Sequence, residues 1–548
     1  MVILAGLAAA LVWEAWVTGV IIDGPSHLLS AHLYWRGADR LEPGDMPPLI
    51  KLAAGWVPGF FHPPVPYDHP IWATQHEWFI SGEMMQKMTG PQIHTLFFFS
   101  RLPLLIFPLL TALLVWHWGR LLFGSWVGIL LSLLYALEPT ALAHGALFKN
   151  DLAATFTYFL FWYRAWHFWK EACLRNVVWL AGALLLAVLA KMSMLFLLLV
   201  APAILLLRYA TLPGRKLRVA ALAMVVLVLI PYLGLVTAYQ FDVRRLPAAE
   251  LAAHRADPSL PHTFIWAAHV FRVIPVPARM WKGVVSLFQA NDSGNLIYLL
   301  GKIYPDGHPL YFVISLALKV PIPIQILALC GAVMVALRLP RKQLEAADVF
   351  WLLPGVLYVF LASLSSLQLG VRLVLPALPF GLLLCGPPVA AWIHDRRIAI
   401  LAGLFTWLVI KSVDAYPNGI SFFNRWVGGP ERGLLYLADS NVDWGQDLAE
   451  LADFVNSRGI PRIHLSYFGN DNPYRYFRED QVEIVVPPWG KEWAKGSVYK
   501  PEPGFYAISA DLIPGQMFGP QYRDYYRAFR NMKPIAKAGY SIHIYYVP

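Results

Sequence analysis

Two side chains near the start of the chain have the types and spacing for acid–base chemistry. Asp23 is the first carboxylate to emerge from an apolar run, residues 2–22, and His27 follows four residues later. The two share a face if this segment is helical. A carboxylate fixed where a membrane helix ends is well placed to act as a base toward a lipid-borne substrate. Taken alone, Asp23 has a simpler interpretation as the boundary of a membrane segment.

Further charged groups adjoin apolar runs on the side of the membrane where we place Asp23. They are Lys149, Asp151, Lys191, Lys319 and Arg372. Charged groups at the mouths of membrane helices are costly and usually face a cavity or a partner. Together they meet the needs of sugar transfer from a polyprenyl phosphate, in which a carboxylate takes the acceptor's proton and cations stabilise the departing phosphate. The alternative for each cation is contact with lipid headgroups.

The composition predicts a polytopic membrane protein. Of the 548 residues, 57% are hydrophobic and only 14% are charged, whereas a soluble domain is nearer a quarter charged. The net charge of +10 does not indicate nucleic-acid binding, because most of the clustered Lys and Arg lie in short loops between apolar runs. The three cysteines are widely spaced and predict neither a disulfide framework nor a zinc site.

The apolar runs predict about eleven transmembrane helices. They are expected at residues 2–22, 98–118, 124–142, 151–169, two halves of 178–207, 217–238, 319–338, 347–365, 371–393 and 397–415. Lys191 lies near the middle of the run 178–207, where we expect the chain to turn between two short helices. Because Pro321 and Pro323 favour a helix start, residues 308–318 are expected to form an interfacial helix that leaves Lys319 at the mouth of the next span. Two long polar loops, 23–95 and 239–307, separate the spans.

The charges of the loops predict the orientation. Basic residues collect on the side opposite Asp23, namely Arg120, Lys170, Arg175, Arg208, Arg215, Lys216, Arg218, Arg338, Arg341, Lys342, Arg396 and Arg397. Basic loops stay in the cytoplasm, so the Asp23 side is expected to be exoplasmic, which is periplasmic in the inner membrane of a Gram-negative cell. An odd number of spans places the carboxyl-terminal tail on the same side.

The composition becomes that of a soluble domain from about residue 416. Residues 434–440 (LLYLADS) are expected to form a buried strand and residues 443–458 a helix with an apolar stripe. Four further strands are expected at residues 463–468, 482–486, 505–509 and 542–547. The predicted organisation is a transmembrane domain, residues 1–415, followed by a small exoplasmic α/β domain, residues 416–548.

Several segments, in their order along the chain, resemble the GT-C membrane glycosyltransferases of family 39, which include the protein O-mannosyltransferases and the lipid A aminoarabinose transferase. They are DGPSHLLSAHLYWRGADRLEPGDMPPLIKLAA, RLPLLIFPLLTALLVWHWGRLLFG, HGALFKND, AKMSML, SGNLIYLLGKIY with ALKVP, LGVRLVLPALPF, and AYPNGISFFNRWVGGPERGLLYLADSNVDWGQDL. The last is similar to the tail of one bacterial subgroup. The resemblance covers nearly the whole chain, and its specificity comes from the order of the segments.

The resemblance implies the GT-C fold and an enzyme, a polyprenyl-phosphate-dependent hexosyl- or pentosyltransferase. It implies inversion at the anomeric carbon, with no covalent enzyme intermediate. Asp23 aligns with the family's first-loop aspartate, regarded as the base, and Asp151 with its second-loop aspartate, so the resemblance implies that both are catalytic residues. We assign His27, Lys191, Lys319 and Arg372 to the substrate and its lipid phosphate. No metal and no cofactor is expected.

Two residues depart from the family pattern. Gly24 stands where the family usually has Glu, and Met46 stands where it often has His before Pro-Pro. Any contribution of that glutamate or histidine to the acceptor is therefore missing here. A catalytically inactive membrane scaffold remains an alternative for this reason. A lipid or sugar transporter or flippase is another, although the chain lacks the duplicated halves typical of transporters.

An acidic group in the tail allows two interpretations. Asp439, Asn441, Asp443 and Asp447 either hold a metal or cap a strand-to-helix turn, and we prefer the cap. The expected partners are the lipid bilayer, a polyprenyl-phosphate sugar donor, and an acceptor that is a protein, a lipid or a glycan.

Overall fold

The computed structural model describes most of the chain. The described residues are 1–39, 41, 46–212, 217–261, 268–269, 271–340, 343–489 and 496–548. Four of the basic loop residues used to predict the orientation lie outside these ranges, namely Arg215, Lys216, Arg341 and Lys342.

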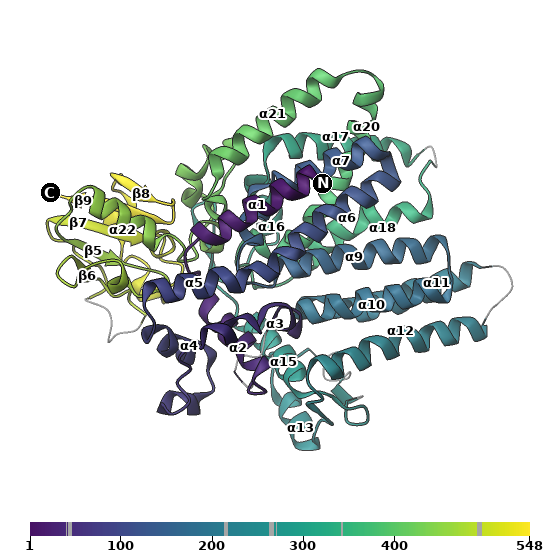
Figure 1. The fold of residues 1–548 in the computed structure, drawn as a ribbon, viewed down its shortest axis with the longest axis horizontal. Coiled ribbons are helices and arrows are strands. Elements are labelled where there is room, and N and C mark those ends of the chain that lie inside the picture. Colours follow the sequence, from purple (N-terminus) through teal and green to yellow (C-terminus); the bar gives the residue numbers. More distant parts are fainter. Residues whose placement is uncertain are drawn as a thin grey trace.

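Long apolar helices pack side by side as a bundle. They are α1 (Val2–Val17), α5 (Gly90–Arg101), α6 (Ile106–Phe123), α7 (Ser125–Ala136), α8 (Pro139–Gly145), α9 (Asp151–Lys170), α10 (Leu174–Ala190), α11 (Leu197–Thr211), α12 (Leu217–Ala238), α17 (Ile322–Arg338), α18 (Val349–Ser363), α19 (Leu378–Leu384), α20 (Gly386–His394) and α21 (Ile398–Ala415). Such runs form helices in a bilayer because a helix satisfies every backbone group internally. Figure 1 shows a small sheet domain at one end of the bundle, with the end of α11 and the start of α12 far from it.

The structure confirms an integral membrane protein. Among the described residues, six helices are long and apolar enough to cross a membrane, or seven if the pair α7 and α8, bent by 65°, counts as one span. Three shorter apolar helices, α1, α10 and α17, lie where further spans are expected. The number of about eleven spans therefore stays a prediction.

Both helix breaks that the sequence predicts are present. Helix α10 ends at Ala190, Lys191 is extended, and a 3₁₀ turn, η4 (Met192–Phe196), leads into α11. Helix α16 (Tyr311–Lys319) ends at Lys319, and α17 begins after Pro321. Each break leaves a lysine at the end of a helix, where its ammonium can reach other elements.

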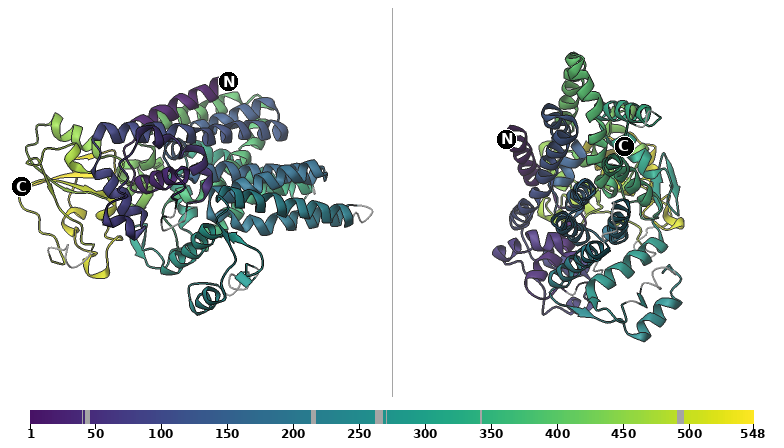
Figure 2. Two further views of the ribbon diagram at one scale, coloured as in Figure 1. Left: turned by 60° about the horizontal axis from the view of Figure 1, so that its bottom comes forward. Right: turned by 90° about the vertical axis from the view of Figure 1, so that its right-hand side faces the viewer.

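The polar loops carry short elements on the side of the sheet domain and below the bundle (Figure 2). They are α2 (Gly24–Trp35), α3 (Pro48–Ala54), α4 (Glu77–Gln86), α13 (Ala248–Ala256), α15 (Ala278–Ser293), and the antiparallel pairs β1 (Val243–Arg244) with β2 (Val276–Pro277) and β3 (Ile297–Leu299) with β4 (Lys302–Tyr304). Met46, which departs from the family pattern, is buried in the apolar core.

A buried ionic group joins the two long loops. Asp39 Oδ2 accepts from Lys51 Nζ at 2.9 Å and from Arg279 Nη1 at 3.0 Å, and Ser30 Oγ donates to Asp39 Oδ1 at 3.1 Å. The side chains of Asp39 and Lys51 are each 6% exposed. Because Arg279 belongs to α15, this group fixes the second loop against the first.

The carboxyl-terminal domain is a five-stranded mixed sheet in the order β6-β5-β7-β9-β8. Its elements are α22 (Leu448–Ser457), β5 (Ile463–Ser466), β6 (Val482–Ile484), β7 (Gly504–Ser509), α23 (Arg527–Arg530), β8 (Ala536–Ala538) and β9 (Ile542–Val547). Strand β5 pairs in parallel with β6 and β7, and β9 pairs antiparallel with β7 and β8. The apolar stripe of α22, which includes Leu451 and Val455, covers one face of the sheet. The four strands expected after residue 460 are confirmed.

The segment between α21 and α22 differs from the prediction. Residues 434–440 form no strand: they run from the end of one 3₁₀ helix, η9 (Pro430–Leu435), to the start of another, η10 (Asp439–Asn441), and Leu437 between them is bridged to Leu299. The helix begins at Leu448 rather than at residue 443. Leu437 is buried, and Tyr436 partly buried, against the membrane domain beside Tyr311 and Val371 instead of within the sheet.

Candidate functional site

The charged residues predicted from the sequence come from separate elements. Asp23 precedes the first turn of α2 and His27 lies within that helix. Lys149 lies between α8 and α9, Asp151 is the first residue of α9, and Lys191 follows α10. Arg372 lies in a 3₁₀ helix, η6 (Val371–Ala377). The position of Asp151 is favourable in itself, because a carboxylate stabilises a helix amino terminus.

Lys149 joins Asp23 and His27. Its Nζ donates to Asp23 Oδ2 at 2.5 Å and lies 3.3 Å from His27 Nε2. The side chain of Lys149 is 8% exposed and that of Asp23 is 17% exposed. Asp23 is therefore the more accessible partner of this ion pair.

Lys191 and Arg372 both face Asp151. Lys191 Nζ donates to Asp151 Oδ1 at 2.6 Å, and Arg372 Nη1 lies 3.7 Å from Asp151 Oδ2. Asp151 is only 1% exposed. With both aspartates ionised, the two carboxylates and the three cations give this cluster a net charge of +1. We call Asp23, Lys149, Asp151, Lys191 and Arg372 the charged cluster.

The carboxyl-terminal region forms one wall of the charged cluster. Arg372 Nε donates to Ser440 Oγ at 2.9 Å. The ring of Trp444 lies 4.4 Å from Arg372 Cζ and 5.5 Å from Lys149 Nζ, measured from its centroid. Both distances are within the range of a cation–π contact. Trp444 is buried, so the ring also keeps water from that side of the two cations.

The pKa values of the first-loop pair follow from burial and neighbouring charge. Burial by itself raises the pKa of Asp23, but the positive charges of Lys149 and Arg372 outweigh it and lower this pKa to about 2. Burial and then the Lys149 ammonium lower the pKa of His27 to about 3. At neutral pH Asp23 is therefore ionised and the ring of His27 is neutral.

Lys319 lies apart from the charged cluster. Its Nζ donates to the backbone carbonyls of Ile420 and Asn441, each at 2.6 Å, and it is 1% exposed. Of the six predicted site residues, the structure thus brings together Asp23, His27, Asp151, Lys191 and Arg372, and it places Lys319 where it holds the carboxyl-terminal segment to the membrane domain.

Sequence reasoning gave Lys149 no separate role and missed three neighbours of the charged cluster. Ser440 and Trp444 contact it directly, as described above. His144 lies with its ring centroid 5.7 Å from that of Trp444, and neither ring nitrogen has a hydrogen-bond partner among the described residues. His144 opens the HGALFKND segment, which was the available signal. Ser440 and Trp444 offered none, because Ser440 ends the segment expected to form a strand and Trp444 lies in the segment expected to form a helix.

The acidic group of the tail forms a turn. Asp443 Oδ1 accepts from Gly445 N at 2.9 Å, and Asp439 Oδ1 accepts from Ser440 N. Asp447 precedes α22 but its side chain does not cap that helix. Within the described residues, no group of three or more His, Cys, Asp or Glu is arranged to hold a metal ion.

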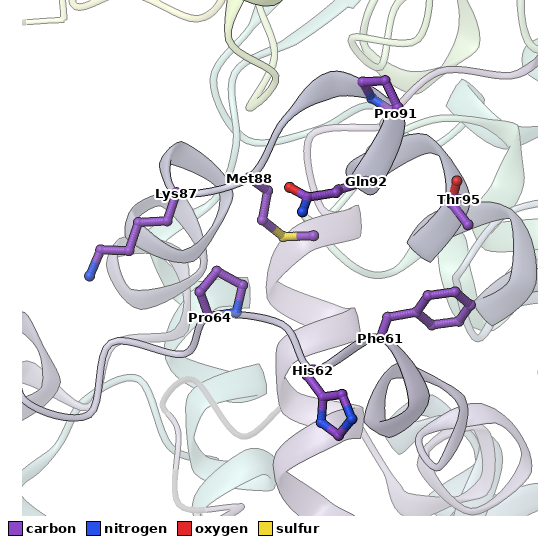
Figure 3. A pocket seen from close by; sticks show the side chains of 8 residues that line it. All are labelled: Phe61, His62, Pro64, Lys87, Met88, Pro91, Gln92 and Thr95. Carbon is purple, nitrogen blue, oxygen red and sulfur yellow. The ribbon is translucent and has the colours of Figure 1, made fainter.

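A separate pocket of about 450 Å³ opens between a 3₁₀ turn, η1 (Val57–Phe61), and the helices α4 and α5. Figure 3 shows side chains that line it, among them His62, Lys87, Met88 and Gln92. None of the predicted site residues lines this pocket.

No protein-family model matches the chain, and no curated protein matches its sequence. Among solved structures, the chain is similar to ArnT from Cupriavidus metallidurans bound to undecaprenyl phosphate, with 14% identity and a TM-score of 0.43 over 99% of this chain and 97% of that one. It is also similar to the Archaeoglobus fulgidus oligosaccharyltransferase, with 12% identity and a TM-score of 0.42 over 92% of this chain and 69% of that one.

Proposed function

We propose that the protein transfers a sugar from a polyprenyl-phosphate carrier to an acceptor at the exoplasmic face of the inner membrane. The observation that supports this most directly is the charged cluster. Five charged side chains from four parts of the fold meet in one buried place at the end of the helical bundle, next to the soluble domain. Charges in such a position are costly unless they serve a partner or a substrate.

The excess positive charge of the cluster suits a phosphate. Lys149, Lys191 and Arg372 outnumber the two aspartates by one, so a bound phosphate anion brings the cluster to neutrality or below. Cations held away from bulk water stabilise the charge that develops on a departing lipid phosphate. Burial of Asp151 and its two cationic contacts favour a structural role for that carboxylate, which keeps Lys191 and Arg372 in place.

Asp23 is the base in this proposal. It is ionised at neutral pH and is more exposed than Asp151. It can accept the proton of an acceptor group while the sugar moves from the phosphate with inversion, so no covalent intermediate with the enzyme forms. His27, neutral beside the same ammonium, is placed to orient the acceptor or donor by hydrogen bonding.

The test compares Asp23→Asn with the wild type in cells. Asparagine keeps the shape of the side chain but is not a base, so turnover should fall by roughly 10²–10⁴-fold. Mass spectrometry of envelope glycans, lipids and glycoproteins from cells with and without the protein identifies the product as the added mass of one hexose or pentose. The rate at which that product accumulates is then measured for the variant.

Asp306→Asn is the matched control, because Asp306 is an exposed aspartate in the second polar loop and is not a member of the charged cluster. It should behave as the wild type. If Asp23→Asn retains nearly the full rate while Asp151→Asn is inactive, the two aspartates have exchanged roles. A wild-type protein that adds no sugar to any envelope component would favour the transporter or the inactive scaffold instead.

A further inference from the structure

We propose that the soluble carboxyl-terminal region is a working part of the transfer site, in which Trp444 and Asn470 are positioning residues for the candidate base and for the cations that receive the phosphate. This inference rests on the proposed function for the identity of the substrate. The claim that the soluble region holds the turn before Asp23 and the cations, which we call the bracing, rests on contacts between residues 439–470 and the membrane domain.

The first set of contacts holds the turn that carries Asp23. The backbone N–H of Ile22 donates to the carbonyl of Trp444 at 2.8 Å, and Asn470 Nδ2 donates to the carbonyl of Ile22 at 2.7 Å. The residue immediately before the candidate base is therefore bonded on both of its backbone groups by the soluble region. Without these bonds Asp23 would be held by its pairing with Lys149 and by the bonds that its own carbonyl accepts from Ser26 and His27.

The approach of the two parts is close. A Cβ atom added to Gly19 would lie 2.2 Å from the carbonyl oxygen of Gln446, a distance that real Cβ atoms do not show. From the other side, Arg101 donates to the backbone carbonyls of Ala15, Thr18 and Gly19. The turn after α1 is thus held between a buried arginine of the membrane domain and the soluble region.

The second set of contacts holds the cations. Ser440 accepts from Arg372 Nε, and Asn441 Oδ1 accepts from the backbone N–H of Val371 at 2.9 Å. The carbonyl of Asn441 also accepts from Lys319. The ring of Trp444 lies beside Arg372 and Lys149. Arg372 and Lys149 therefore both rest against a surface that the soluble region provides. In the membrane domain alone, the charged cluster would lack the contacts that Ser440 and Trp444 make with its cations.

Hydrogen–deuterium exchange tests the bracing without any assay of transfer. In the full-length protein, Asn470→Ala removes one bond to Ile22 and should speed exchange of the amides in residues 18–24 by roughly 5-fold. Asn472→Ala is the matched control, since Asn472 lies in the same loop but bonds to Tyr474 N. It should leave exchange in residues 18–24 unchanged. Gly19→Ala should also speed this exchange, because the turn must move away from Gln446.

Binding of a polyprenyl phosphate to the protein in detergent tests whether Trp444 supports the cations of the charged cluster. Trp444→Ala removes the ring beside two cations and should weaken binding by roughly 2- to 30-fold. Trp444→Phe keeps an aromatic ring and should recover most of the affinity. The control is Trp426→Ala, because Trp426 is 69% exposed and belongs to the same region.

The outcomes separate this inference from the proposed function. Equal exchange in Asn470→Ala and Asn472→Ala, with equal lipid affinity in Trp444→Ala and Trp426→Ala, would overturn the inference even if the wild type transfers sugar. If Asn470→Ala exchanges faster and Trp444→Ala binds lipid more weakly, but the wild type transfers no sugar, the bracing is supported and the proposed sugar transfer is rejected. If Trp444→Ala does not fold, the exchange comparison decides: faster exchange of residues 18–24 in Asn470→Ala than in Asn472→Ala supports the inference, and equal exchange overturns it.

Discussion

At the scale of residues, the two aspartates of the charged cluster occupy different surroundings. Asp151 is almost completely buried and contacts two cations, whereas Asp23 contacts one ammonium and is partly accessible. A group that must meet an acceptor needs access, and a group that fixes cations needs burial and close contact. This difference is the physical ground for giving Asp23 the proton transfer and Asp151 the positioning role.

Lys191 should contribute directly to donor affinity. A bond between a charged group and its partner contributes about 1.5–3 kcal/mol, so Lys191→Met should weaken binding of a polyprenyl phosphate by roughly 10- to 100-fold. Lys191→Arg should restore only part of the affinity, because the guanidinium is larger and planar. Binding is measured on the purified protein in detergent.

Two further variants control for folding. Lys191→Met leaves Asp151 with only the longer contact to Arg372, so the double variant Lys191→Met, Asp151→Asn removes the uncompensated charge. It should regain stability but not affinity. Lys319→Met should lower stability and weaken lipid binding less than Lys191→Met does, since Lys319 bonds to the backbone carbonyls of Ile420 and Asn441 and not to the charged cluster. Unchanged affinity in Lys191→Met would exclude that residue from the phosphate site.

At the scale of elements, the buried ionic group of the long loops should contribute strongly to stability. Asp39→Ala leaves Lys51 buried without a carboxylate, and breaking such a pair costs about 3–5 kcal/mol. The thermal unfolding midpoint of the detergent-solubilised protein should therefore fall clearly, whereas Asp306→Asn should not change it. Asp39→Ala combined with Lys51→Met should recover part of the loss. A midpoint equal to the wild type in Asp39→Ala would mean that the two loops are held by other contacts.

The elements that the sequence predicts correctly are those whose pattern is decided locally. A lysine in the middle of an apolar run marks the break between α10 and α11, and a pair of prolines marks the start of α17. The strands β5, β6, β7 and β9 follow from short β-rich runs. Residues 434–440 have a similar pattern, but their buried Leu437 packs against the membrane domain, so their partner lies in another part of the fold. No local pattern reveals that partner.

The same reasoning explains what could be predicted of the site. Charged residues beside apolar runs are rare enough to identify, and five of the six residues chosen in this way meet in one place. Trp444 is one of 22 tryptophans, and the resemblance of its segment to the tail of a bacterial subgroup does not single it out. Its contact with Lys149 exists only because the carboxyl-terminal region packs against the end of the bundle.

At the scale of the whole molecule, the predicted orientation can be tested by cysteine labelling. Ser457 is exposed at the end of α22, and Asp395 is exposed after α20. In a background without Cys173, Cys330 and Cys385, a membrane-impermeant maleimide should label Ser457→Cys once the outer membrane is opened. Asp395→Cys should be labelled only after the inner membrane is also opened. If Asp395→Cys is labelled first and Ser457→Cys only after the inner membrane is opened, the orientation is the reverse of the predicted one. If both are labelled under the same condition, α21 between them does not cross the membrane, which contradicts the predicted set of spans.

The ion pair between Lys149 and Asp23 links two equilibria that are otherwise separate. A phosphate bound at Lys149 shares its ammonium and adds negative charge next to Asp23, so the pKa of Asp23 should rise from its value of about 2 in the free protein. Such coupling is reciprocal: if the donor strengthens proton binding at Asp23, a proton at Asp23 strengthens donor binding by the same factor. Donor affinity should therefore increase as the pH falls toward the raised pKa, beyond what titration of the phosphate itself produces. Asp23→Asn should lose that additional increase when affinity is measured across the same pH series. Binding of the donor thus raises the basicity of the Asp23 carboxylate, so Asp23 becomes a stronger base only when a sugar phosphate is present.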